Sequence, residues 1–145
     1  MSELSMNQDE RDEFLASVRV AVLAVTRDDG PPLVTPVWYR YSPGGDIEVN
    51  IARDSEKARL LTAAGRASLC AQREALPYAY VTIEGPVEIA ETTPEAREDI
   101  AVRYLGAELG AAYVASTADV DDVIVRLRPE RWRTVDYAKL DMSPP

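Results

Sequence analysis

The sequence contains no histidine and only one cysteine among its 145 residues. Without histidine, the chain cannot form a His-ligated zinc site, a haem with a proximal histidine, a Ser-His-Asp triad or a Cys-His pair. The single cysteine, Cys70, excludes an internal disulfide and any site made of several thiolates, and its apolar neighbours predict a small buried residue. If the protein is an enzyme, a cofactor therefore carries the chemistry. We expect no catalytic side chain and no bound metal.

Positive charge is also scarce. The chain has 16 lysines and arginines against 25 aspartates and glutamates, which gives a net charge of −9. This balance argues against nucleic acid or an anionic membrane surface as a partner, so an anionic ligand would need a local basic patch. The apolar runs are only a few residues long, so neither a signal peptide nor a membrane span is expected. The predicted location is the cytoplasm.

The length of 145 residues fits one domain, residues 1–145, with a hydrophobic content of 46%. Alternating or continuous apolar patterns predict about six strands, and turn residues separate them. The predicted strands are residues 20–25, 33–41, 47–51, 66–72, 78–89 and 123–127, with residues 131–137 as a bent continuation of the last strand. The ends, residues 1–6 and 139–145, are predicted to be flexible.

Helices are predicted before the first strand, over residues 56–64, and as a pair before the last strand. At the first helix, Ser5 and Gln8 have the spacing of a capping box. Short connections favour antiparallel pairing, and Gly85-Pro86 predicts a sharp bend of the kind found at barrel corners. The predicted fold is mainly β (α+β): a six-stranded antiparallel β-barrel, closed or split, with peripheral helices.

The stretch from Asp46 to Gly65 reads as a strand, a polar turn and a helix. Asp54 or Ser55 can cap the helix N-terminus, and Gly65 stands where a left-handed cap would end it. Lys57 falls in the first turn of this helix, close to the free N–H groups.

Two interpretations of the cations around this turn remain open. Arg53, Lys57 and Arg59 can form an anion site together with the helix N-terminus, and phosphate is the usual occupant of such a site. Alternatively, they are solvated surface charges that Asp54 and Glu56 partly neutralise.

Pro36 lies in the middle of the predicted strand 33–41. Because proline cannot donate a ladder hydrogen bond, the strand must be an edge or contain a bulge there. A bulge would free backbone groups near Val37 and Trp38 for a ligand. Equally, Trp38, Tyr39 and Tyr41 can be plain aromatics of the core and of a dimer interface.

Taken in order, several segments of the chain are similar to one known superfamily. They are VAVLAVTRDDGPPLVTPVWYRY, VNIARDSEKARLL, GRASLCAQ, YAYVTIEGPVEI, RYLG and RPERWRTVDY. The chain resembles the flavin/deazaflavin oxidoreductase superfamily, the split β-barrels related to pyridoxamine 5′-phosphate oxidase. Within that superfamily it resembles the actinobacterial branch that uses coenzyme F420. The resemblance covers nearly the whole chain, and its specificity comes from the ordered set of segments.

The resemblance implies a six-stranded antiparallel split β-barrel of the FMN-binding type, and a homodimer with two cofactor sites at the interface. The cofactor phosphate would lie at the helix start after the third strand, and the ring system along the second strand. A tyrosine before the bend of the fifth strand would complete the site. Ser55 departs from the pattern, because several relatives carry a second basic residue there. The residues implied to bind the cofactor are Thr35, Pro36, Val37, Trp38, Arg53, Ser55, Lys57, Arg59 and Tyr80.

The function that the resemblance implies is a reductase that transfers hydride from coenzyme F420 to a small, conjugated, electron-poor substrate. Hydride transfer requires no protein nucleophile, because the protein orients the two rings and excludes water. FMN is an alternative cofactor, since it also has a tricyclic ring and a phosphate. A non-enzymatic carrier of a flavin, haem or lipid-like ligand is a third hypothesis. The expected partners are the small-molecule substrate and a second copy of the chain, and not nucleic acid or a membrane.

Two features of the sequence differ from particular members of the superfamily and exclude their reactions from the expected function. The chain lacks the histidine that haem-degrading split barrels use. Its length and its C-terminal sequence do not fit a true pyridoxine-phosphate oxidase, so vitamin B6 is not the expected substrate.

Overall fold

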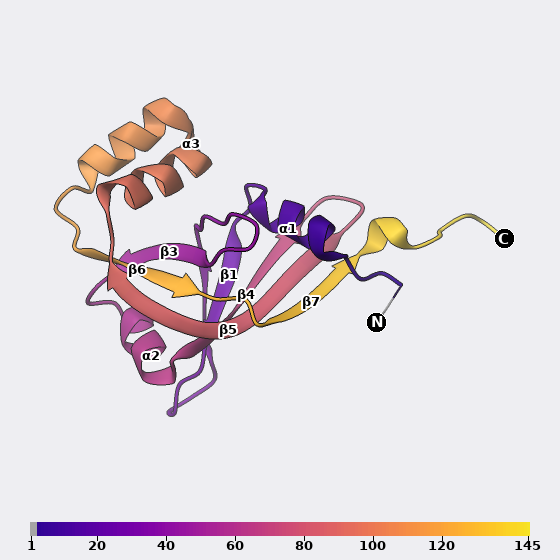
Figure 1. Ribbon diagram of the computed structural model, residues 1–145, viewed down its shortest axis with the longest axis horizontal. Helices are drawn as coiled ribbons and strands as arrows, with labels where there is room; N and C mark the ends of the chain where they lie inside the picture. Colours follow the sequence, from indigo (N-terminus) through magenta and orange to yellow (C-terminus); the bar gives the residue numbers. More distant parts are fainter. Residues whose placement is uncertain (1–2) are drawn as a thin grey trace.

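Seven β-strands form an antiparallel sheet in the computed structural model, which describes residues 3–145 (Figure 1). Six of them follow the order β2-β1-β4-β5-β6-β3, and β7 pairs with β5 on the edge that β6 also uses, opposite β4. The sheet curls strongly, with α1 and α3 on one side of it and α2 on the other side (Figure 1). The strands are β1 (Ala21–Val25), β2 (Leu33–Val37), β3 (Ile47–Ala52), β4 (Arg66–Arg73), β5 (Ala79–Glu91), β6 (Asp122–Leu127) and β7 (Arg131–Asp136). This confirms the predicted split-barrel fold.

The long strand β5 belongs to both halves of the barrel. Its first part pairs with β4 and β7, and its second part, from Val87 onward, pairs with β6. The change of partner occurs at Gly85-Pro86, where the sequence predicts a corner. The bend lets one strand serve two sheets.

The segment 131–137 is a bent continuation of the last strand, as the sequence predicted. Strands β6 and β7 pair with the same edge of β5, and the pairing shifts by one residue between Leu127 opposite Val87 and Arg131 opposite Glu84. Between them the Arg128 N–H donates to Pro86 O and the Glu130 N–H to Glu84 O, so residues 128–130 form a bulge at the corner of β5. The bulge divides the predicted last strand into β6 and β7, which is why the structure has seven strands where the sequence predicts six.

Alternating residues of the strands fill the inside of the barrel, as the period of two requires. The two shorter helices close it: α1 (Gln8–Ala16) contributes Phe14 and Leu15, and α2 (Glu56–Ala64) contributes Leu60 and Leu61. The largest side chains that are almost completely buried are Tyr39, Leu15, Leu23, Ile47, Leu61, Leu69, Ile83, Ile124 and Leu127.

Helix ends follow the capping rules, with one change from the prediction. Helix α1 has its capping box at Asn7 and Glu10, whose side chains each accept from the other's backbone N–H. The predicted pair Ser5 and Gln8 does not cap it. The spacing rule was satisfied twice within a few residues, and asparagine at least equals serine as an N-cap.

Of the two predicted N-cap residues of α2, the structure uses Ser55, and the helix ends at Gly65 as predicted. Ser55 caps α2, accepting from the Ala58 N–H, and Gly65 ends it in the left-handed region at φ 68°. Thr93 caps α3 (Pro94–Ser116), and Gly106 at φ 84° and ψ 171° breaks α3 into two antiparallel halves. Within residues 3–145, no helix combines the length and the apolar character that crossing a membrane requires.

The two ends of the described chain lie on the same side of the molecule (Figure 1). Met6 is buried, its N–H donates to Thr134, and the Lys139 ammonium donates to Ser5 O and to Glu10. Residues 1 and 2 lie outside the described part. Flexibility of residues 1–6 and 139–145 stays a prediction, and these contacts argue against it at Met6 and Lys139.

Tyr39 gives the fold a pH-dependent element. Its hydroxyl donates to Leu15 O at 2.6 Å, and burial raises its pKa to about 12. An unfolded tyrosine ionises near pH 10, so between pH 10 and 12 the unfolded chain loses a proton that the folded chain keeps. We expect stability to fall across this range, and to fall less steeply in Tyr39→Phe, as denaturant unfolding at pH 9, 10, 11 and 12 would measure. Equal slopes for both proteins would contradict this assignment.

Candidate functional site

A cleft of about 390 Å³ lies where the barrel is split. The two outermost strands of the main path, β2 and β3, are joined only by a bridge between Arg40 and Glu48. Beyond that bridge, the end of β2 and the end of β3 form the floor of the cleft, and α3 covers it. The lining residues used below are Pro36, Val37 and Trp38 beside β2, Asn50 and Ile51 of β3, Lys57 of α2, and Arg97, Tyr113 and Thr117 beside or within α3.

The place of β2 in the sheet shows whether Pro36 lies in an edge strand or at a bulge. Strand β2 is an edge strand, so the proline leaves no partner strand without a hydrogen bond. The same edge is what exposes Pro36 and Trp38 to the cleft. Edge position, rather than a bulge, explains the proline.

The cleft contains one charge without a counter-ion. Arg97 pairs with Asp122 at 3.2 Å, both side chains being about 15% exposed, and also donates to the carbonyl and hydroxyl of Thr117. Asn50 accepts from Thr92 at 2.6 Å. The half-buried Lys57 has no hydrogen-bond or ion-pair partner among the residues that the structure describes. The cleft therefore presents a net positive charge next to apolar surface.

Hydrogen bonds of Ser55 fix the start of the helix that carries Lys57. The Ser55 hydroxyl accepts from the Ala58 N–H and donates to Ala52 O at 2.7 Å, which ties the helix start to the end of β3. Lys57 is the second residue of the helix, so its backbone lies at the positive end of the helix dipole, and the residue lines the cleft. Neighbouring N–H groups and the ammonium favour an anion at the same place.

Trp38 forms the aromatic wall of the cleft. Its ring stacks on Tyr104 with 5.0 Å between centroids and 8° between planes, and contacts Tyr113 at 5.7 Å and 49°. The Tyr104 hydroxyl donates to Arg19 O at 2.6 Å and accepts the Tyr39 N–H at 3.1 Å. Because Tyr104 is fixed in this way, it holds one face of Trp38. Of the three aromatics near Pro36, only Trp38 lines the cleft.

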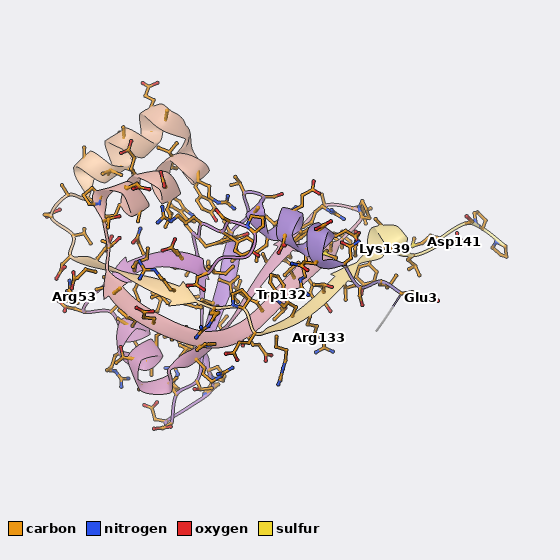
Figure 2. The ribbon with its side chains drawn as sticks, viewed as in Figure 1. Glu3, Arg53, Trp132, Arg133, Lys139 and Asp141 are labelled. Carbon is orange, nitrogen blue, oxygen red and sulfur yellow. The ribbon has the colours of Figure 1, made fainter. Side chains whose placement is uncertain are left out.

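The structure separates two of the predicted cations from Lys57. Arg53 donates two hydrogen bonds to Glu91 and two to Asp121, and the Glu91 carboxylate, followed by Asp121, raises its pKa. It lies at the end of the sheet where β6 begins (Figure 2). Arg59 pairs with Glu56 one turn away on α2 and faces a different, smaller hollow. Neither arginine lines the cleft.

Thr35 and Tyr80 also lie apart from the cleft. Thr35 pairs with Leu23 of β1 and so shares the inner side of the sheet. Tyr80 pairs with Gln72 and Val135 and lies on the outer side of β5. Of the nine residues implied by the resemblance, the cleft therefore brings together Pro36, Val37, Trp38 and Lys57, and Ser55 positions the lysine.

Sequence reasoning missed the contribution of α3. It predicted a pair of helices before the last strand, but did not place Arg97, Tyr113 or Thr117 beside the second strand. The helix-breaking glycine, Gly106, was the available signal, because it predicts that the two halves of the helix fold back on each other.

Comparison with known sequences agrees with this architecture. The profile described as pyridoxamine 5′-phosphate oxidase matches residues 8–136, from the start of α1 to the end of β7. The chain belongs to the pyridoxamine 5′-phosphate oxidase family. No curated protein matches the chain.

Solved structures share the split-barrel fold of this pyridoxamine 5′-phosphate oxidase family member. The conserved hypothetical protein Rv2991 from Mycobacterium tuberculosis is 28% identical, with a TM-score of 0.79 over 100% of this chain and 96% of that one. An F420 reductase is 21% identical, with a TM-score of 0.61 over 84% and 94%. A heme binding protein from Mycobacterium smegmatis is 21% identical, with a TM-score of 0.62 over 92% and 60%. The last two likenesses concern the fold alone.

Proposed function

We propose that this family member is an oxidoreductase that holds coenzyme F420, through its phosphate and ring system, in the cleft beside β2. The observation that carries the proposal is the uncompensated ammonium of Lys57 in a cleft whose other charged groups pair with each other. A half-buried cation without a partner is costly, and a phosphate oxygen relieves that cost through a charge-assisted hydrogen bond. The similarity in fold to an F420 reductase supports the same cofactor class.

The residues of the cleft fit such a cofactor. Its volume of about 390 Å³ lies within the range of roughly 300–1,000 Å³ that is usual for small-molecule sites. Pro36, Val37 and Ile51 supply apolar surface, and Trp38 supplies an aromatic wall. A histidine-ligated haem, in contrast, has no ligand in this sequence. The combination of one cation with apolar and aromatic walls matches a phosphate joined to a planar ring system.

When bound in reduced form, a deazaflavin supplies a hydride from its C5 carbon. The roles of the chain's own residues are binding, orientation and exclusion of water. Lys57 holds the phosphate, Trp38 is fixed against Tyr104 beside the ring, and α3 covers the cleft from solvent.

Titration of the purified protein with coenzyme F420 and, in parallel, with FMN tests the proposal, with ligand fluorescence as the readout. Saturable binding of coenzyme F420 at micromolar concentration or below is the expected result. Stronger binding of FMN than of coenzyme F420 would support the same site with FMN as its cofactor. No binding of either ligand would contradict the proposal and leave the carrier hypothesis in the lead.

We also propose that the chain forms a homodimer through the outer face of the sheet, defined here by Val34, Pro36, Val22, Cys70 and Thr82. These residues lie side by side, because Pro36 and Cys70 flank Val22, and Thr82 pairs with Cys70. Val34 is 62% and Val22 37% exposed. A contiguous apolar surface of this kind favours a protein partner.

This dimer would explain the partial exposure of Cys70 and the position of Tyr80. Cys70, predicted to be buried, is only half-buried in one chain and would be covered by the second copy. Tyr80 lies on the same side of the sheet and does not line the cleft of its own chain, so it can reach a cofactor only from the partner. Arg133, which projects away from β7 on this side, would mark the polar rim (Figure 2).

Replacing Val22 with arginine should convert the dimer to monomers, because a charge would be buried at the centre of an apolar contact. Light scattering after size exclusion measures the mass directly. Leu109→Arg is the matched control: Leu109 is 63% exposed on α3, away from this face, so its variant should remain dimeric. A monomeric wild type, or a Val22→Arg variant that stays dimeric, would contradict the assigned face.

A further inference from the structure

The second half of α3, residues 107–116, forms the outer wall of the cleft and is built to stay in place. Gly106 turns the chain with a φ of 84°, which residues with a side chain rarely adopt. Gly110 then packs so closely on Val102 that an added Cβ would lie 2.8 Å from the Val102 Cα. At the far end, the Arg97 guanidinium holds the carbonyl and hydroxyl of Thr117. The wall is therefore fixed at its start, middle and end.

Tyr113 is the aromatic residue that this wall presents to the cleft. It differs from Tyr104, the other aromatic neighbour of Trp38. Tyr104 stacks flat and uses its hydroxyl twice within the protein. Tyr113 meets Trp38 at an angle of 49°, is 44% exposed, and its hydroxyl has no partner among the residues that the structure describes. Its ring edge and its hydroxyl are both available to a ligand.

We propose that Tyr113 is a specificity-determining residue, which selects planar ring systems by closing the cleft opposite Pro36 and Val37. This inference rests on the proposed function, because it concerns the ligand whose phosphate Lys57 would hold. The two residues contribute to different parts of that ligand: Lys57 recognises the phosphate, and Tyr113 the ring. An angled aromatic contact and one hydrogen bond are the interactions that Tyr113 can add.

Riboflavin and FMN, which have the same ring and differ in the phosphate, separate these two contributions. Tyr113→Leu keeps an apolar side chain of similar length on the helix and removes the ring and the hydroxyl. We expect it to weaken riboflavin and FMN by the same factor, about 3- to 10-fold. Tyr113→Phe should account for at most about 3-fold of this loss, through the hydroxyl. Dissociation constants from flavin fluorescence quenching give both numbers.

Leu109→Ala is the matched control, because Leu109 lies one turn earlier on the same half-helix, is 63% exposed and does not line the cleft. It should change either affinity by less than 2-fold, and far-ultraviolet circular dichroism should show intact helices in every variant. Unchanged affinities in Tyr113→Leu would overturn the inference, as would an equal loss in Leu109→Ala.

A second measurement separates this inference from the proposed function. If Lys57→Ala weakens FMN while Tyr113→Leu changes neither ligand, the cofactor site stands and the role of Tyr113 falls. If the wild type binds coenzyme F420, FMN and riboflavin no better than a denatured sample, both fall together. Trp38 emission, followed in a Trp132→Phe background that leaves one tryptophan, gives an independent readout of ring binding.

Discussion

Replacing Lys57 with alanine is expected to weaken coenzyme F420 and FMN by about 10- to 100-fold and to leave riboflavin unchanged. The size follows from the loss of a charge-assisted hydrogen bond, which contributes about 1.5–3 kcal/mol. The selectivity follows from the position of Lys57, which is the one cation of the cleft that no carboxylate neutralises among the described residues. Fluorescence titration of the three ligands against wild type and variant measures both effects.

The chain offers a matched control in its other lysine. Lys139 pairs with Glu10 on the opposite side of the molecule, so Lys139→Ala changes the net charge equally without touching the cleft. It should bind all three ligands as the wild type does. If both lysine variants lose affinity by the same factor, the loss comes from the changed net charge of the protein and not from a phosphate site at Lys57. If Lys57→Ala also weakens riboflavin equally, Lys57 does not recognise the phosphate.

Gly85→Ala is expected to destabilise the protein by roughly 3 kcal/mol or more and to lower Tm by about 10 °C. A Cβ at this position would lie 1.8 Å from the Arg128 carbonyl oxygen, and no side chain can move aside to make room. The bulge at residues 128–130, where β6 passes into β7 along the edge of β5, depends on this contact, since the hydrogen bonds to Pro86 O and Glu84 O flank it. Thermal and urea unfolding measure the loss.

Gly30→Ala provides the comparison. Gly30 lies in an exposed turn, and its nearest neighbour for an added Cβ is the flexible Arg27 side chain at 3.8 Å. Its substitution should leave the stability within about 0.5 kcal/mol of the wild type. A Gly85→Ala variant as stable as Gly30→Ala would show that the bulge between β6 and β7 can move away from β5.

The parts of the site that sequence reasoning predicted are those governed by neighbours along the chain. Local rules limited the helix cap to Asp54 or Ser55, predicted the left-handed end at Gly65, and limited Pro36 to an edge strand or a bulge. The structure has the cap at Ser55 and the edge position, which place Lys57 at a helix start and Trp38 on an exposed edge.

The cations show where local reasoning stops. Arg53, Lys57 and Arg59 look equivalent in the sequence, but their pairing differs. Arg53 meets Glu91 and Asp121, which are 38 and 68 residues away. Those carboxylates arrive through the pairing of β6 with both β3 and β5, which no pattern near residue 53 encodes.

The sequence by itself determined the split-barrel fold, the helix over residues 56–64 and the position of Lys57 in its first turn, because apolar period, caps and turns act over a few residues. The tertiary structure decided that α1 is capped by Asn7, that Arg53 is neutralised and that α3 closes the cleft over Trp38. The last two depend on which distant segments meet, and that choice is made by burial of the whole core rather than by any one stretch of chain.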